Sequence, residues 1–536
     1  MIDPKDVIAG ASIAEHCHRA ERYFQSVEEP DRLLAKPFIS LNETPLLLYR
    51  LGLVLAGLKV GPTMRVLDFG AGTCWVSHIL ATLQCEVVCV DASDTALALG
   101  RRLFESRPVE GSLHPQFLRF DGETLQVESG SIDRIICFDA LHHLPNTGRI
   151  LSEFHRVLKD GGLAGFSEPG RQHSRSPVSQ YEMAHYGVIE NDVKLEEVKA
   201  LADEAGFTGM LAAAEVGFDT WLDFSEAEPV WSRQALPERW TTACLHSFHG
   251  RSTFVLQKGR YQGDSRLGEG LAGELQIAQH QVEVRVDEPL VFDVTLRNTG
   301  TARWLAKNTS DIGIVKLGAK VRRSDAPDAA PTVHRTWLPH DIAPGESLAL
   351  PVEIAFTEPA THTITLDLLD EQIVWFETLG LVTREMEVSV LPALTGASAR
   401  EGGTLALPFT ARLAHMPVKR LSGFGDAEPF GRWTTDDTAT VVFPAPLPSA
   451  FTLELSCQAF GPNVGKDLAV TVGGQVRHIR LTDAGRQTYA ASFAGVAPAT
   501  QVRLDIPAPT RPRDLGVGDD DRRLGIALSD VSIASA

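Results

Sequence analysis

A glycine-rich turn that follows an acidic residue is the stretch of this sequence best suited to bind a ligand. The turn consists of Gly70, Ala71 and Gly72; Asp68 precedes it, and a second acid, Asp91, ends the next apolar run. Glycine has no Cβ, so the backbone can turn tightly against a ligand, and a following helix offers free N–H groups. A carboxylate at the tip of a second strand can accept both hydroxyls of a ribose. The spacing therefore predicts a site for a ribose-containing cofactor.

Histidines and a glutamate follow two later apolar runs. His142 and His143 come after the run at 131–138, and Glu168 and His173 come after the next one. Histidine is the side chain most easily poised as a base at neutral pH. Because ligands of open α/β sheets bind beyond the carboxyl ends of the strands, we expect these side chains to meet there.

The elements that must hold these residues are indicated by hydrophobic spacing. Residues 66–67 form a short apolar run, 75–83 carry helical spacing, and 87–90 form a β-branched run, which predicts strand, helix and strand. A dinucleotide site would need G-x-G-x-x-G, and the acid before the first glycine would repel a pyrophosphate. The same acid could meet a cationic amino-acid group.

The sequence D-F-G-A-G at 68–72 resembles motif I of the class I S-adenosylmethionine-dependent methyltransferases. Three further segments, 120–122, 131–145 and 151–166, follow in the family's order and spacing. The resemblance spans roughly residues 60–258. It implies an N-terminal Rossmann-like α/β domain with a seven-stranded sheet whose last strand pair is antiparallel.

The same resemblance implies S-adenosylmethionine as the cofactor. Cys74 stands where the family commonly has a third glycine, which leaves the backbone role of that position open. The acid at 121 is the one that in this family faces the adenine amino group. The implied cofactor-binding residues are Asp68, Gly70, Ala71, Gly72, Asp91, Ala92, Asp121, Gly122 and Asp139.

The catalytic residue is less determined than the cofactor site. His143 is the first candidate for a base and His142 the second, although either could merely line the pocket. Glu168 and His173 are further candidates; alternatively, Glu168 caps its loop through backbone N–H groups and His173 is a solvated loop residue. No set of cysteines and histidines has zinc spacing, so we expect no metal site.

Two other features of the N-terminal region bear on the pocket. Helical spacing at 12–27 and 44–59 predicts leading helices, which either close the pocket or cover the sheet edge. Three tryptophans, Trp221, Trp231 and Trp240, lie in an insertion before the last predicted strand.

Composition limits the classes of partner. The chain has 536 residues, a net charge of −19 and no basic stripe, which argues against a nucleic-acid partner. No apolar run is long enough to span a membrane. The amino terminus lacks the basic and apolar regions of a signal peptide, and the seven cysteines are an odd number, which is typical of reduced thiols. We therefore expect a cytoplasmic protein.

Two all-β modules are predicted after the methyltransferase-like region, giving domains at 1–262, 274–393 and 404–536. Short alternating runs separated by turns indicate β-sandwiches. The first resembles bacterial immunoglobulin-like modules that open with N-x-G-x-x-x-W, here Asn298 to Trp304, and we expect that tryptophan to be a core residue. The second resembles a jelly-roll family often fused to envelope glycosyltransferases and phosphoglycerol transferases.

Three functions are compatible with this architecture. The first is O-methylation of a sugar or glycan in cell-envelope polysaccharide biosynthesis, with the β modules binding the polymer. The second is methylation of a lipid or small metabolite, with the modules used for assembly as a homo-oligomer or with glycan-assembly enzymes. The third is a non-catalytic glycan-binding scaffold, which the intact cofactor acids argue against.

Overall fold

The computed structural model describes residues 1–111, 113–213, 223–232, 238, 241–242, 250–394 and 403–535. The chain forms two compact units, Met1–Glu269 with Asn308–Gly313, and Gly270–Lys307 with Ile314–Ala536. The two β modules thus share the second unit, and their separability from each other stays a prediction. Of the predicted insertion, Trp221, Trp240 and the side chain of Trp231 lie outside the described residues.

A mixed seven-stranded sheet forms the centre of the first unit. Its order is β3-β2-β1-β4-β5-β7-β6, and β7 runs antiparallel to both of its neighbours. This confirms the predicted α/β fold and the antiparallel last pair. The strands are β1 (Arg65–Phe69), β2 (Glu86–Asp91), β3 (Gln116–Arg119), β4 (Ile132–Phe138), β5 (Leu158–Pro169), β6 (Gly209–Ala212) and β7 (Arg251–Gln257).

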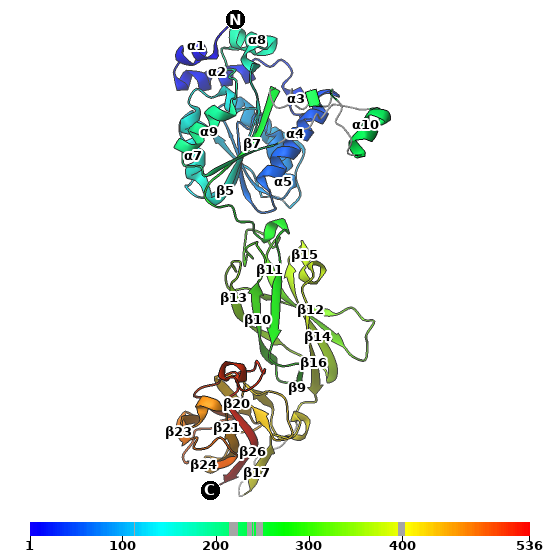
Figure 1. Cartoon of the computed structure of the whole chain (residues 1–536), viewed down its shortest axis with the longest axis vertical. Helices are drawn as coiled ribbons and strands as arrows, with labels where there is room; N and C mark the ends of the chain where they lie inside the picture. The colour runs from blue at the N-terminus through cyan, green and yellow to red at the C-terminus, as the bar shows by residue number, and fades with distance from the viewer. Residues whose placement is uncertain are drawn as a thin grey trace. The chain divides into compact units, whose positions relative to one another are not determined.

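Helices cover both faces of this sheet (Figure 1). Every residue of β4 is buried, as expected for a parallel strand between two helical layers. Alternate strand residues enter two cores, one packed against α7 and α9 and the other against α4 and α5. The helices are α1 (Pro4–Ala9), α2 (Ile13–Gln25), α3 (Pro30–Leu33), α4 (Glu43–Leu58), α5 (Trp75–Thr82), α6 (Asp94–Ser106), α7 (Thr147–Val157), α8 (Pro177–Tyr186), α9 (Leu195–Glu204) and α10 (Phe224–Trp231). Within the described residues, no helix combines the length and the apolar character needed to cross a membrane.

The leading helices take different positions, one by the glycine turn and one on the face of the sheet over β5 and β7 rather than at its edge. Helix α2 lies beside the glycine turn and the loop after β3, because a Cβ on Gly72 would lie 3.7 Å from Phe24 and one on Gly122 would lie 2.3 Å from Ile13. Glu21 of α2 accepts hydrogen bonds from the Ser93 hydroxyl (2.6 Å) and the Thr95 hydroxyl (2.6 Å) at the start of α6. Helix α4 packs instead on the sheet, with Leu58 filling the space above Gly165.

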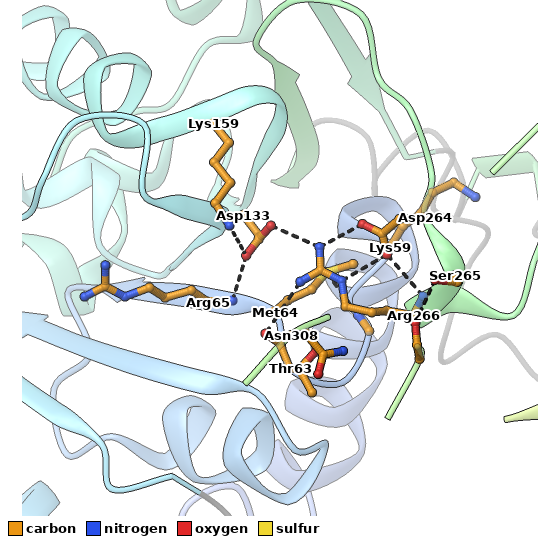
Figure 2. Close-up of polar contacts among 12 residues, drawn as sticks. Lys59, Thr63, Met64, Arg65, Asp133, Lys159, Asp264, Ser265, Arg266 and Asn308 are labelled. Carbon is orange, nitrogen blue, oxygen red and sulfur yellow. Dashed lines mark hydrogen bonds and ion pairs between the residues drawn. The ribbon is translucent and has the colours of Figure 1, made fainter. Parts of the chain in front are cut away.

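A buried ion pair holds the segment after the sheet against the amino-terminal ends of β1 and β4 (Figure 2). Arg266 Nη2 lies 3.1 Å from an Asp133 oxygen and 2.7 Å from Asp264, and Lys159 Nζ lies 2.9 Å from the other Asp133 oxygen. The side chains of Arg266 and Asp133 are 10% and 8% exposed. Burial would raise the pKa of Asp133, but the charges of Arg266 and Lys159 outweigh it and lower that pKa. The Ser265 hydroxyl also donates to the Gly313 carbonyl (2.7 Å).

Two sheets form the first β module. One has the order β13-β10-β8; the other has the order β12-β11-β14-β16-β9, with β15 paired to β14. Their strands are β8 (Gly273–Ile277), β9 (Gln281–Arg285), β10 (Leu290–Asn298), β11 (Val315–Arg323), β12 (Thr332–Trp337), β13 (Ser347–Ile354), β14 (Ala360–Asp370), β15 (Val374–Trp375) and β16 (Arg384–Leu391).

The N-x-G-x-x-x-W motif organises the turn after β10. The Asn298 side chain donates to the carbonyls of Ala302 (2.9 Å) and Ile342 (3.0 Å) and accepts from the Gly300 N–H (3.0 Å). Trp304 is fully buried and packs edge-on against Phe376, so it is a core residue as expected.

Two further sheets enclose the core of the second β module. Their orders are β17-β26-β21-β24, with β19 paired to β26, and β18-β20-β25-β22-β23. Arg285 of β9 donates to the carbonyls of Val418 (3.1 Å) and Leu413 (3.2 Å), which ties the two modules of this unit together. The strands are β17 (Thr404–Pro408), β18 (Arg420–Ser422), β19 (Arg432–Trp433), β20 (Thr438–Val442), β21 (Phe451–Ala459), β22 (Asp467–Val472), β23 (Gln475–Arg480), β24 (Gln487–Phe493), β25 (Gln501–Asp505) and β26 (Ile526–Ser535).

Candidate active site

A cavity of about 580 Å³ lies at the carboxyl ends of the strands, under α2 and beside α8. Most of the residues predicted from the sequence to act in binding or catalysis contribute to its wall. The exceptions are Asp68, Asp121 and Glu168. The predicted residues on the wall are Gly70, Ala71, Gly72, Asp91, Ala92, Gly122, Asp139, His142, His143 and His173.

The glycine turn adopts a conformation that requires glycine. Gly70 and Gly72 have φ values of +68° and +52°, and a Cβ on Gly70 would come within 2.3 Å of the Ala140 Cβ. Cys74 also has a positive φ, +61°, and immediately precedes α5. The cysteine thus adopts the left-handed conformation that favours glycine, so the backbone path is kept at this position.

Asp91 is held in place at the tip of β2 by two backbone groups. Its Oδ2 accepts from the Gly72 N–H (2.8 Å) and its Oδ1 from the Ser93 N–H (2.8 Å). Burial raises the pKa of Asp91, and these two N–H groups oppose that rise. Each carboxylate oxygen keeps a second lone pair, so the side chain can accept two further hydrogen bonds from a ligand in the cavity.

Asp68 faces the protein interior. Its Oδ2 accepts a hydrogen bond of 2.6 Å from the Ser77 hydroxyl of α5, and the residue is 2% exposed. Burial raises the pKa of Asp68 to about 7 against the opposing effect of Ser77. In this structure its direct partner is therefore the helix that begins at the glycine turn.

Asp121 is not among the residues of the cavity wall. Its Oδ1 accepts from the N–H groups of Glu123 and Thr124, both at 2.8 Å, and these bonds lower its pKa. Its neighbours Phe120 and Gly122 line the wall instead. The contact of Asp121 with adenine stays a prediction from the sequence resemblance.

Asp139 lies at the end of β4 and is paired with a cation. The Arg251 guanidinium bonds to its carboxylate and also to the Ser167 carbonyl (3.1 Å). Arg251 was not predicted from the sequence, because β7 begins only at that residue and no motif marks it. This pair forms part of the cavity wall.

Glu168 caps the loop after β4 with its carboxylate. It is fully buried, and its Oε1 accepts from the N–H groups of Ala140 (3.0 Å) and Leu141 (2.9 Å). Its Oε2 lies 2.8 Å from His142 Nδ1. This arrangement matches the capping alternative considered from the sequence and adds the orientation of one imidazole.

His143 and His173 converge on a glutamate that sequence reasoning missed, Glu190. His143 Nδ1 donates to the Ile189 carbonyl (2.7 Å) and lies 3.3 Å from Glu190 Oε1, while His173 Nε2 lies 2.7 Å from Glu190 Oε2. Burial would raise the pKa of Glu190, but His173 and the other two histidines outweigh it and lower that pKa. Glu182 of α8 stands beside it, and burial together with Glu190 raises its pKa to about 7.

The acceptor end of the cavity is therefore a cluster of imidazoles and carboxylates. Its signal in the sequence was weak, because Glu182 and Glu190 follow β5 in a segment that has no motif. The aromatic wall from α2, Tyr23 and Phe24, was equally unmarked. His173, considered as a solvated loop residue, instead bonds to Glu190.

Comparison with known proteins supports the reading of the first unit. Residues 67–166 match the family model of the methyltransferase domain. S-adenosylmethionine, the cofactor predicted from the sequence, is consistent with this match. Residues 405–535 match a family described as a domain of unknown function (DUF7024).

Solved structures with a similar fold include two methyltransferases. Haemonchus contortus phosphoethanolamine N-methyltransferase 2, in complex with S-adenosyl-L-methionine, is 16% identical, with a TM-score of 0.34 over 47% of this chain and 60% of that chain. Geranyl diphosphate C-methyltransferase from Streptomyces coelicolor is 14% identical, with a TM-score of 0.32 over 46% of this chain and 98% of that chain.

The curated relatives are similar over a short stretch. Phosphoglycerol transferase I of Salmonella arizonae is 28% identical over 132 residues, which is 24% of this chain and 17% of that protein. The same protein of Salmonella typhi is 28% identical over 131 residues, with the same coverage. The chain spans about 17% of the length of these relatives.

Proposed function

We propose that the first unit transfers a methyl group from S-adenosylmethionine to a sugar or glycan end in cell-envelope polysaccharide biosynthesis. The observation that supports it most is the position of Asp91, bonded to the Gly72 N–H, on the wall of the cavity. The match of residues 67–166 to the methyltransferase domain supports the reaction class.

The cofactor would lie between the glycine turn and α2. Asp91 has acceptor capacity for the two ribose hydroxyls, and Gly70, Ala71 and Gly72 let the backbone approach the bound molecule. Asp68 supports the turn through Ser77 in this proposal, and its carboxylate lies too deep to be part of the wall. Asp121 holds its own loop.

The chemistry places an acceptor beside the histidine cluster. When bound, the cofactor supplies an electrophilic methyl group to a nucleophilic oxygen or nitrogen of the acceptor. His143 Nδ1 donates to the Ile189 carbonyl, so in the neutral ring Nε2 carries a lone pair. We assign the uptake of the acceptor's proton to this cluster, with His143 Nε2 as its first candidate. Glu168 acts by orienting His142.

The glycan acceptor is inferred from the β modules. The curated relatives over 132 residues are phosphoglycerol transferases I, and the sequence of the last module resembles modules fused to envelope glycosyltransferases. Exposed aromatic side chains of the β modules are candidates for glycan contact; Trp337 is 49% exposed, whereas Phe376 is buried in the core. The Trp375 ring packs against Gly318, and the Lys320 ammonium lies 4.1 Å from the centre of that ring. Trp337 is the most exposed of these residues, although the Lys316 ammonium lies 3.7 Å from its ring centre and covers one face.

A second acceptor class has its own support. The cavity wall is partly apolar, with Tyr23, Phe24 and Val178 among its residues, which would suit a lipid or a small metabolite. The β modules would then serve assembly, as a homo-oligomer or with glycan-assembly enzymes.

Transfer of labelled methyl groups tests the two acceptor classes. The full chain is incubated with methyl-labelled S-adenosylmethionine and with separated polysaccharide, lipid and small-metabolite fractions. The proposal expects label in the polysaccharide fraction, lost in His143→Ala but kept in His185→Ala, whose imidazole is exposed on α8. Label in the lipid or metabolite fraction alone would overturn the glycan assignment. Label in no fraction would count against the proposed methyltransferase activity.

A further inference from the structure

The acceptor end of the cavity contains a set of side chains that sequence spacing did not reveal as metal ligands. His142, His143 and Glu190 each offer one ligand atom, and the three atoms lie within 4.8 Å of one another. All three residues belong to the cavity wall. Two of them follow β4, and the third follows α8 by four residues, so only the fold brings them together.

Both imidazoles are held in the tautomer that a metal ligand needs. His142 Nδ1 is 2.8 Å from Glu168 Oε2, and His143 Nδ1 donates to the Ile189 carbonyl at 2.7 Å. In metal centres the ligating histidine commonly donates its other ring N–H to a carboxylate or a backbone carbonyl. Among the described residues, nothing forms a hydrogen bond to Nε2 of either ring.

Glu190 provides the independent observation. Its side chain is 2% exposed, its Oε2 is bonded to His173, and its Oε1 is buried without a donor among the described residues except the neighbouring Glu182 carboxyl when that group is protonated. Oε1 lies 3.3 Å from His143 Nδ1, whose proton is already used by Ile189. A buried carboxylate oxygen without a partner is costly, and a cation would remove that cost.

We propose that His142, His143 and Glu190 bind a divalent transition-metal ion of the zinc, iron or manganese class. Two imidazoles and one carboxylate form a ligand set that these ions use, with positions left open for another ligand. Magnesium does not fit, because it prefers oxygen ligands. His173 and Glu168 are positioning residues, one for the glutamate and one for the first imidazole.

The catalytic role of the ion rests on the proposed methyl transfer. An acceptor hydroxyl bound at an open position of the ion would have its pKa lowered, and its proton would leave to solvent or to Glu182. His143 would then bind the ion through Nε2 instead of taking the acceptor's proton. The ion would activate the acceptor oxygen in its place. Metal binding itself is measured without turnover.

Metal binding to the full chain tests the proposal. The protein is stripped with a chelator, and Zn²⁺ and Co²⁺ are titrated, with Co²⁺ followed by its visible absorption. We expect one equivalent to bind, with Mg²⁺ unable to compete. Glu190→Gln and His142→Gln should lose this equivalent. Glu168→Gln should weaken it by about 10–100-fold, the usual effect of removing a partner behind a ligand.

Two controls separate this result from misfolding and from failure of the proposed function. His185→Gln, which alters an exposed imidazole of α8, should keep the metal equivalent. S-adenosylmethionine affinity should be unchanged in Glu190→Gln, which shows that the cavity has folded. No stoichiometric binding by the parent protein, or equal binding by Glu190→Gln, overturns the metal site. In that case a proton shared between Glu182 and Glu190 accounts for the cluster, and the methyltransferase proposal stands on its own test.

Discussion

Two adjacent histidines have different environments in this protein. The His142 side chain is 6% exposed and rests on Glu168, whereas that of His143 is 43% exposed. Burial lowers the pKa of His142 well below its usual value, with the charge of His143 adding to the effect. At neutral pH His142 is therefore an uncharged wall residue, and His143 is the one with room to meet an acceptor.

Replacing His143 by alanine should lower turnover by about 10²-fold or more, the usual scale of acid–base catalysis. Steady-state kinetics with a labelled cofactor measures this. Cofactor affinity should barely change, because the imidazole faces the acceptor end. If turnover survives in His143→Ala and is lost in His142→Ala or His173→Ala, the role passes to that residue.

The buried carboxyl of Asp68 should make the stability of the folded chain depend on pH. Its pKa is raised to about 7 in the folded chain, so between roughly pH 4 and 7 the folded state keeps a proton that the unfolded state has released. This contribution to stability is present at low pH and is lost as the pH rises through 7. Asp68→Asn should flatten that slope.

Thermal unfolding of the parent and the Asn variant at several pH values from 4.5 to about 8 measures the difference. Asp68→Asn keeps an oxygen that can accept from Ser77, so its melting temperature should fall less between these pH values than that of the parent. Identical slopes in the two proteins would show that Asp68 is ionised in the folded state at neutral pH.

At the level of elements, the glycine turn and the strands around it could be predicted because each has a distinct pattern. Apolar runs mark β1, β2 and β4, and Asp91 is the last residue of β2. The acceptor side could not be predicted as well, since Glu190 lies in a segment without regular spacing. The hydrogen-bond partner of a carboxylate could also not be predicted from the sequence. Asp121 accepts from its own turn, and nothing in the D-x-G motif indicates that Asp68 accepts from Ser77.

Helix α2 is the element that closes the cofactor end of the cavity. Glu21 attaches it to the start of α6 through two hydroxyls and the Thr95 N–H (3.2 Å). Burial would raise the pKa of Glu21, but the bonds from Ser93 and Thr95 outweigh it and lower that pKa. Removal of this carboxylate should therefore free the helix without touching the cavity wall.

Glu21→Ala should increase hydrogen exchange in Ile13–Gln25 and raise the dissociation rate of S-adenosylmethionine several-fold. Glu28→Ala is the matched control, because this exposed acid follows the same helix. Equal exchange and equal dissociation rates in both variants would mean that packing alone holds α2.

At the scale of the whole molecule, the first unit extends past the boundary predicted at 262. The contacts of Arg266 with Asp133 and Asp264 bury two charges of opposite sign beside the strand ends (Figure 2). Removal of Arg266 would leave Asp133 with Lys159 (2.9 Å) but would take the paired cation from the largely buried Asp264, and loss of a partner of a buried charge is destabilising. The glycines of 263–273 therefore do not by themselves define a free linker.

Arg266→Ala should increase limited proteolysis within Tyr261–Gly273 compared with the parent. Mass spectrometry of the first fragments locates the cuts. Arg260→Ala, which removes a nearby cation outside the Asp133 pair, is the control. An unchanged rate in Arg266→Ala would show that the ion pair does not hold the segment, and first cuts inside 66–90 would contradict the whole domain division.

In the proposed function, the cavity beneath α2 binds S-adenosylmethionine through Asp91. Isothermal titration calorimetry of the full chain and of Asp91→Ala tests it most directly. Loss of hydrogen bonds to a charged acceptor costs on the order of 1.5–3 kcal/mol, so the variant should bind about tenfold more weakly or worse. Asp94→Ala, which alters an exposed acid near the same strand, should bind like the parent. Unchanged affinity in Asp91→Ala, or no binding by the parent, would contradict the account.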